Sequence, residues 1–163
     1  MTDPQIRPFT AADQVAVKAL ILAGLADHWG VLDPTLNPDL NDIAGWYGPK
    51  GGYTVVLQIE DQIAGTGTIF ERDAQTAELV RMSVSGAHRG QGIGTRLVRA
   101  LADEARRRGY IAIECETTDT WDDAIALYRK CGFEIIDRHS GDIFFRLNLR
   151  NVLTEHSRLG REE

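Results

Sequence analysis

A glycine-rich turn, Arg89-Gly-Gln-Gly-Ile-Gly94, is the sequence feature that most restricts how this chain folds. It follows Glu78–Val84, which reads as a strand, and it leads into apolar residues at helical spacing, namely Ile93, Leu97, Val98, Leu101 and Ala105. Glycines let a backbone approach a ligand closely and turn several N–H groups inward, and a helix start adds the positive end of its dipole. The segment therefore predicts a strand, a tight turn and a helix around an anion such as a pyrophosphate.

Two common phosphate-binding motifs do not fit this turn. A Walker A loop needs a lysine after its last glycine, and none follows Gly94. The dinucleotide fingerprint G-x-G-x-x-G, started at Gly90 or Gly92, would need glycine where the chain has Thr95 or Leu97. A glycine-rich strand-to-helix turn that binds no ligand is the alternative interpretation.

The apolar periodicity along the whole chain predicts a mixed α/β fold with the element order β-α-α-β-β-β-α-β-α-β-β. The expected strands are short runs rich in apolar and β-branched residues: Ile6–Phe9, Tyr53–Ile59, Ile63–Phe70, Glu78–Val84, Ile111–Glu116, Phe133–Asp137 and Ile143–Leu149. The second and third of these runs flank a tight polar turn and predict a hairpin.

Start and stop signals bound the expected helices. These signals are Thr10-x-x-Asp13 with Gly24, the glycine turn with Gly109, and Thr120-x-x-Asp123 with Cys131-Gly132. The apolar face of the first helix is expected to hold Ala12, Val15, Ala16, Ala19, Leu20 and Ala23. An irregular connection over 26–49 is expected to include one short helix near residues 40–47.

Composition narrows the class of protein. The chain has 163 residues and a formal net charge of -6, so we expect one domain over residues 1–150, a polar tail over 151–163, and no nucleic-acid partner. Two cysteines are too few for a tetrahedral cysteine cage, and no metal site is predicted. The start lacks the features of a signal peptide, and no run of about 18 apolar residues exists. A cytoplasmic protein that does not bind membranes is expected.

Two segments together resemble the signature of a known family. Leu79–Val84 followed by Arg89–Gly94 is similar to the acetyl-CoA motif R/Q-x-x-G-x-G/A of the GNAT superfamily of N-acetyltransferases, and Ala124–Phe133 is similar to its second motif. The resemblance covers residues 5–149. It implies a mixed, mostly antiparallel central sheet flanked by helices, in which a splayed pair of strands holds acetyl-CoA.

The resemblance also implies which residues hold acetyl-CoA. Backbone amides of the motif contact the pyrophosphate in this family, and the matching residues are Arg89, Gly90, Gln91, Gly92, Ile93, Gly94 and Thr95, with Arg96 as a further side-chain contact. Free backbone groups of Met82 and Val84 are expected to pair with the pantetheine arm, and the Met82 N–H to donate to the thioester carbonyl oxygen. By strand alternation, the side chains of Met82 and Val84 are expected on the same face as Val80.

Two residues match catalytic positions of the family. Tyr128 matches the tyrosine that commonly serves as general acid for the departing thiolate, and a phenol of pKa about 10 suits that task. Glu78 matches the glutamate that acts as general base in some members, and strand alternation is expected to put it on the face of Met82. Core packing of Tyr128 and a surface role for Glu78 are the alternatives. A chain of waters, Glu71 or His28 could replace Glu78 as the base.

The resemblance says less about the acceptor than about the acyl donor. The expected acceptor-binding residues are His28, Trp29 and Trp121, and core packing is their alternative role. Trp121 stands where many members have an asparagine that contacts the pantetheine. The implied activity is transfer of acetyl from acetyl-CoA to a primary amine of a small molecule or a protein, by direct attack through a tetrahedral intermediate. A catalytically silent acyl-CoA-binding module is the alternative, and both a monomer and a homodimer are compatible with the sequence.

Overall fold

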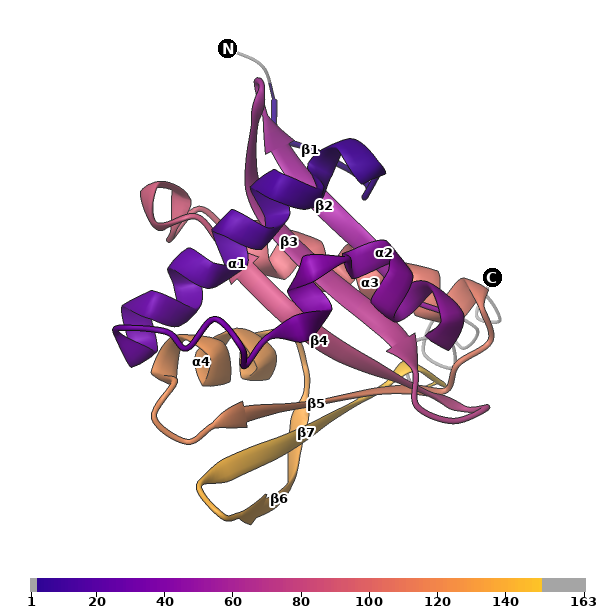
Figure 1. The fold of residues 1–163 in the computed structure, drawn as a ribbon. Helices are drawn as coiled ribbons and strands as arrows, with labels where there is room; N and C mark the ends of the chain where they lie inside the picture. The colour runs from indigo at the N-terminus through magenta and orange to yellow at the C-terminus, as the bar shows by residue number, and fades with distance from the viewer. Residues whose placement is uncertain (1–2, 151–163) are drawn as a thin grey trace.

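The computed structural model describes residues 3–150, and over this range seven strands form one sheet in the order β1-β2-β3-β4-β5-β7-β6 (Figure 1). Neighbouring strands are antiparallel except β4 and β5, which are parallel. The strands are β1 (Gln5–Pro8), β2 (Tyr53–Ile59), β3 (Gln62–Glu71), β4 (Thr76–Val84), β5 (Ala112–Thr118), β6 (Glu134–His139) and β7 (Asp142–Asn148). The helices are α1 (Gln14–Trp29), α2 (Ile43–Tyr47), α3 (Ile93–Arg107) and α4 (Asp122–Lys130). The mixed, mostly antiparallel sheet flanked by helices is confirmed.

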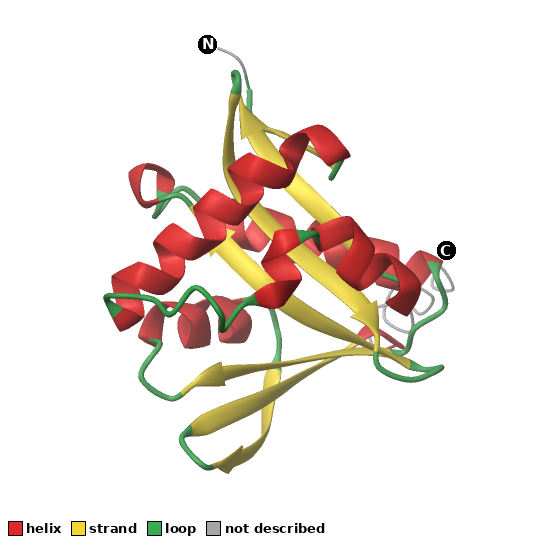
Figure 2. Cartoon of the chain, in the orientation of Figure 1, coloured by secondary structure: helices red, strands yellow, loops and turns green. Residues whose placement is uncertain are grey.

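Helices cover both faces of the sheet (Figure 2). Helices α1 and α2 bury one face through a core of Val17, Ile21, Leu40, Ile43, Tyr47 and Val56. Helix α3 and Tyr128 of α4 belong to the larger core on the other face, whose fully buried side chains include Leu97, Leu101, Ile113 and Phe145. The apolar stripe of α3 predicted from the sequence is confirmed, because Ile93, Leu97, Val98, Leu101 and Ala105 are all buried.

Strands β4 and β5 part soon after they meet. Their parallel pairing is limited to three residue pairs, Thr76–Glu78 with Ala112–Glu114. Beyond Glu78 the two strands diverge, while β4 continues to pair with β3 and β5 with β7. The expected splay is therefore present, and it leaves one edge of β4 without a strand partner from Leu79 onward.

A β-bulge interrupts β4 at its midpoint. Val80 opposes Thr68 and Ser83 opposes Thr66, so Arg81 and Met82 together face Gly67. Arg81 has a φ of 56°, a left-handed conformation that is uncommon for a residue other than glycine. A bulge of one extra residue reverses the side-chain alternation of the strand beyond it.

This bulge corrects two predictions about side-chain direction. Met82 and Val84 pack into the core on the α3 side, whereas Val80 packs against α1 and α2, so the three do not share a face. Glu78 alternates with Leu79, which belongs to the α3-side core, and so lies on the face opposite Met82. Strict two-residue alternation failed because the extra residue at Arg81 was not visible in the sequence.

Helix α1 differs from the prediction in its length and in its buried face. It runs to Trp29, with Gly30 as its C-cap, and Gly24 lies inside it. Val17 and Ile21 are buried, whereas Val15, on the predicted face, is 82% exposed. Gly24 serves close packing, since a Cβ there would lie 2.9 Å from Ser83 Oγ on β4.

Other local predictions have mixed outcomes. The capping box of Thr10 and Asp13 is present, but the element that it caps is a 3₁₀ turn, Ala11–Asp13, that precedes α1. Trp121, not Thr120, is the N-cap of α4, and no side chain caps that helix. The expected tail over 151–163 lies outside the described residues. No helix within residues 3–150 is long and apolar enough to cross a membrane.

Candidate active site

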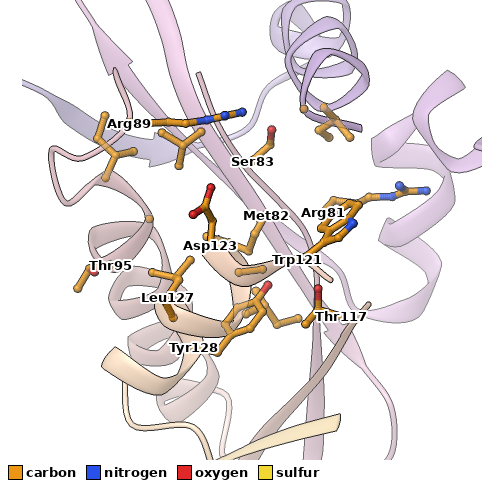
Figure 3. A pocket seen from close by; sticks show the side chains of 18 of the residues that line it. Arg81, Met82, Ser83, Arg89, Thr95, Thr117, Trp121, Asp123, Leu127 and Tyr128 are labelled. Carbon is orange, nitrogen blue, oxygen red and sulfur yellow. The ribbon is translucent and has the colours of Figure 1, made fainter. Parts of the chain in front are cut away.

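A cavity of about 660 Å³ occupies the gap opened by the splay of β4 and β5. Its lining comes from the second half of α1, from β4 from Glu78 onward, from the end of β5, from the glycine-rich turn and from α4 (Figure 3). It therefore joins the two sequence motifs, which lie 30 residues apart along the chain when counted from Gly94 to Ala124. The glycine-rich turn and the second motif therefore contribute residues to the same cavity.

The glycine-rich turn forms one end of this cavity. Gly90 and Gly92 have φ values of 78° and 77°, and a Cβ added at either would meet nothing within 4 Å. Gly92 is the N-cap of α3 and offers no side chain, and the helical hydrogen bonds begin with Arg96 N–H donating to Gly92 (3.1 Å). The N–H groups of the first turn thus have no acceptor within the helix. Open backbone donors at the positive end of a 15-residue helix fit a diphosphate.

Most of the residues that the resemblance assigns to acetyl-CoA line the cavity: Met82, Val84, Arg89, Gly90, Gly92, Ile93, Gly94 and Thr95. Gln91 does not line it. Arg96 lies elsewhere, with its guanidinium donating to the Pro4 carbonyl oxygen (3.3 Å). The guanidinium of Arg89 pairs with Asp27 near the end of α1 (3.0 Å), and both side chains are about half exposed.

Tyr128 is buried at the inner wall of the cavity. Its residue exposure is 6%, and its ring packs against Phe133 and Phe145 with centroids 5.5 Å from each. Figure 3 shows its hydroxyl directed into the cavity. Burial raises the pKa of Tyr128 well above its usual value, so the phenol keeps its proton at neutral pH. The ring of Tyr128 thus packs in the core while its residue also lines the cavity, so the two roles considered from the sequence are compatible.

Glu78 lines the cavity at the point where β4 and β5 separate. Burial raises the pKa of Glu78 above its usual value, and the carboxylates of Glu116 and Glu114 raise it further, against the opposing effect of Arg72. Glu114 itself is held by Arg72 (2.6 Å) and Arg146 (2.8 Å). Although Glu78 and Met82 occupy opposite faces of β4, both reach the cavity, because the splay opens the edge between the two faces.

The three predicted acceptor residues meet at one place. His28 at the end of α1 stacks on Trp121 at the start of α4, and Trp29 lies 5.8 Å from the same indole, measured between ring centroids. His28 and Trp121 line the cavity, whereas Trp29 is 56% exposed and contacts it only through Trp121. Glu71, the weaker candidate base, does not line the cavity.

The sequence interpretation missed Arg81 and its partners. Arg81 lines the cavity and donates two hydrogen bonds to Asp39, from Nε to Oδ2 (2.9 Å) and from Nη2 to Oδ1 (2.8 Å). Asp39 also accepts from the hydroxyl of Tyr47 (2.6 Å), and Asn37 accepts from Arg81 (3.1 Å). Burial of Asp39 disfavours its charged form, but the bonds from Arg81 and Tyr47 outweigh burial and hold its pKa below the usual value.

Nothing local in the sequence marks this network, because Asp39 and Arg81 are 42 residues apart. Glu116, Thr117 and Asp123 also line the cavity without having been singled out. Among residues 3–150, no group of three or more histidine, cysteine, aspartate or glutamate side chains could hold a metal ion.

Comparison with known proteins agrees with this geometry. The chain is 29% identical to the uncharacterized N-acetyltransferase YjgM of Escherichia coli (strain K12) over 82% of this chain and 84% of that protein. It is 32% identical to human N-acetyltransferase 8B over 74% of this chain and 54% of that protein. A structure of yncA from Salmonella typhimurium, described as a putative acetyltransferase with its cofactor acetyl-CoA, superposes with a TM-score of 0.75, at 22% identity and over 91% and 95% of the two chains.

The chain spans about half the length of several curated relatives that it matches. The model of the acetyltransferase (GNAT) family matches residues 21–133, which include both sequence motifs and most of the cavity lining. The chain therefore belongs to the acetyltransferase (GNAT) family.

Proposed function

We propose that this protein is an acetyl-CoA-dependent N-acetyltransferase that moves an acetyl group to a primary amine by direct attack. The observation that carries the proposal is the continuity of one cavity from the glycine-rich turn, along the unpaired edge of β4, to Tyr128 and Glu78. Family membership supports it, as does the fold shared with a structure described as containing acetyl-CoA.

The glycine-rich turn and β4 bind the acyl donor in this proposal. Backbone N–H groups of Gly90–Gly94 contact the pyrophosphate, with Arg89 released from Asp27 to add its charge. The free edge of β4 at Met82 and Val84 pairs with the amides of the pantetheine arm, as an added strand would. Acetyl-CoA supplies an activated thioester, and the protein supplies its placement.

Tyr128 and Glu78 move the protons. Tyr128 donates a proton or hydrogen bond to the departing sulfur, and its raised pKa keeps the proton available at neutral pH. Glu78 takes a proton from the acceptor ammonium, since only the free amine attacks a carbonyl carbon. The raised pKa of Glu78 makes it a stronger base than an exposed carboxylate. The Met82 N–H donates to the carbonyl oxygen as that oxygen gains charge.

The acceptor approaches from the side of α1 and α4. His28 and Trp121 form an aromatic wall there, with Trp29 behind it, and Glu78 lies on the β4 side of the same cavity. A negative side chain with aromatic faces suits a primary ammonium group. The acceptor is therefore a primary amine carried by a small molecule or by a protein.

Thiol release from acetyl-CoA, measured over a panel of amines, tests this function. The panel should contain amino acids, diamines, aminoglycosides, and peptides with a free N-terminus or lysine. Acceptor-dependent release with a matching mass gain of one acetyl group on the amine is the expected result. Tight CoA binding without acceptor-dependent release over the whole panel would instead indicate a silent acyl-CoA-binding module.

A further inference from the structure

Arg81 fastens the bulge of β4 to the segment that precedes α2. Its guanidinium makes a two-pronged contact with Asp39, at 2.9 Å and 2.8 Å, and a further bond to Asn37. The hydroxyl of Tyr47 on α2 donates to the same carboxylate, at 2.6 Å to Oδ2. The side chain of Asp39 is 8% exposed and that of Arg81 is 23% exposed. A bidentate, largely buried contact of this kind fixes the direction as well as the distance of its partners.

The backbone at Arg81 needs such a restraint. Its φ of 56° is a strained conformation for a side chain of this size, and strained residues persist only where their surroundings hold them. The strain occurs at the bulge, where Arg81 and Met82 oppose a single residue of β3. Both residues line the cavity, and Met82 carries the N–H assigned above to the carbonyl oxygen.

We propose that the ion pair between Arg81 and Asp39 holds the β4 bulge in the conformation required for acetyl transfer, which makes both of them positioning residues. The inference rests on the proposed function. Without the pair, the extra residue loses its restraint, and the backbone of Met82 shifts within the cavity. The pyrophosphate end, which lies beyond Val84 in the glycine-rich turn, keeps its geometry. The transfer step is then impaired more than the binding of acetyl-CoA.

Substitution of Asp39 can distinguish a positioning role of the ion pair from direct contact of Arg81 with the substrate. Asp39 bonds to Arg81 and Tyr47, and of these three residues Arg81 alone lines the cavity, so Arg81 is the link from Asp39 to the cavity. The chain also provides a matched control, the pair between Arg7 and Asp13. That pair is also two-pronged, from Nη1 and Nη2 of Arg7 at 2.8 Å each, and its aspartate side chain is 7% exposed, but it joins β1 to the start of α1 outside the cavity.

The experiment compares Asp39→Asn and Arg81→Ala with Asp13→Asn and the wild type. Arg81→Gly is added because glycine lacks the clamp but accepts a positive φ without strain, so it is expected to be at least as thermally stable as Arg81→Ala and to lose less kcat. For each variant that is folded by circular dichroism, kcat, the KM for acetyl-CoA and amide hydrogen exchange of the peptide over 79–85 are measured.

Asp39→Asn and Arg81→Ala are expected to lower kcat by about 10- to 100-fold, the scale of a small misplacement at a reacting centre, with the KM for acetyl-CoA within about threefold. Exchange over 79–85 is expected to be faster in both. Asp13→Asn is expected to lower thermal stability but keep kcat and this exchange within about twofold of the wild type.

Two results would overturn the inference: wild-type kcat in folded Asp39→Asn, or an equal loss of kcat in Asp13→Asn, which would point to general destabilisation. A wild type that acetylates no amine defeats the proposed function instead. In that case the exchange comparison alone decides whether the pair holds the bulge, and equal exchange in Asp39→Asn and the wild type rejects it.

Discussion

The imidazole of His28 lies nearly flat on the indole of Trp121, with ring centroids 4.1 Å apart and ring planes inclined by 15°. The contact links the last turn of α1 to the first turn of α4 across the cavity. Stacked aromatic pairs contribute about 0.5–1.5 kcal/mol beyond the area that they bury. The two residues therefore hold each other in place at the side of the cavity where we propose that the acceptor enters.

Trp121→Ala should weaken acceptor binding. Loss of the indole removes one face of the aromatic wall and the support of His28, so the KM for the acceptor should rise by about 5- to 10-fold, in line with an aromatic contact of about 1 kcal/mol. The affinity for acetyl-CoA, measured by calorimetry, should change little. Trp46→Ala is the matched control, because Trp46 is also partly exposed but does not line the cavity. An unchanged acceptor KM in Trp121→Ala would remove this residue from the acceptor site.

Tyr128→Phe should lower kcat by about 100-fold, the typical contribution of a positioned general acid, while acetyl-CoA binds as before. The phenyl ring keeps its packing against Phe133 and Phe145, so thermal stability should be preserved. Because burial raises the pKa of Tyr128, its ionisation should not reduce turnover between neutral pH and moderately alkaline pH. Steady-state kinetics with calorimetric titration of CoA checks this expectation, and wild-type turnover in Tyr128→Phe would exclude it as the acid.

Glu78→Gln should remove an acidic limb from the pH profile. The base works when deprotonated, so wild-type kcat/KM should rise with pH through the raised pKa of Glu78 and level off above it. The variant should lack this limb and lose about 10- to 100-fold at the plateau. Glu71→Gln, which changes a carboxylate outside the cavity, should retain the limb. A limb that survives in Glu78→Gln would assign the base to another group.

Gly92→Glu should weaken the binding of CoA by at least about tenfold, since it adds a negative charge and a side chain at the proposed pyrophosphate site. Gly141→Glu is the matched control. Gly141 has a φ of 81° in the turn between β6 and β7, and a Cβ there also meets nothing within 4 Å. The backbone cost of a positive φ, roughly 1 kcal/mol, is therefore common to both variants. Equal CoA affinities in the two variants would argue against the phosphate assignment.

Acid should destabilise the fold through Asp13. The hydrogen bonds from Arg7 lower the pKa of Asp13 from 3.8 to about 2, so the native state favours the ionised carboxylate more than the unfolded chain does. The resulting stability, about 1–2 kcal/mol after allowance for the partly exposed Arg7, is present above pH 3.8 and is lost as the pH falls toward 2. Urea denaturation measures the free energy of unfolding at pH 7 and at pH 3. The difference between the two values should be smaller for Asp13→Asn than for the wild type.

Strong periodicity made the helix after the glycine turn and the β2–β3 hairpin predictable from the sequence. Helix α3 combines buried Leu97 and Leu101 with charged residues on its outer side, so its buried stripe can be read directly. Helix α1 offers no such contrast, because alanines and larger apolar residues surround it. The spacing of the small alanines predicted the wrong buried face for this helix. The larger side chains of Val17 and Ile21 pack into the core instead. Tertiary contacts decide the orientation of a helix of this composition.

The motifs located most of the cavity, but not the contacts made across it. The match at Tyr128 and the glycine-rich turn identified residues that the fold brings to one cavity. The bulge at Arg81 depends on a restraint from Asp39, and no periodic pattern encodes a contact over that separation. The predicted face of Glu78 relative to Met82 was wrong for the same reason.

The brief pairing of β4 with β5 also divides the sheet into two parts. Four strands, β1 to β4, form one part and β5, β7 and β6 form another, and the strand pairing between the two parts is limited to the three residue pairs that start at Thr76 and Ala112. Glu78 belongs to the first part, whereas Tyr128 lies on α4, which follows β5 in the second. The divergence of β4 and β5 after Glu78 therefore sets how far apart the proposed base and the proposed acid lie.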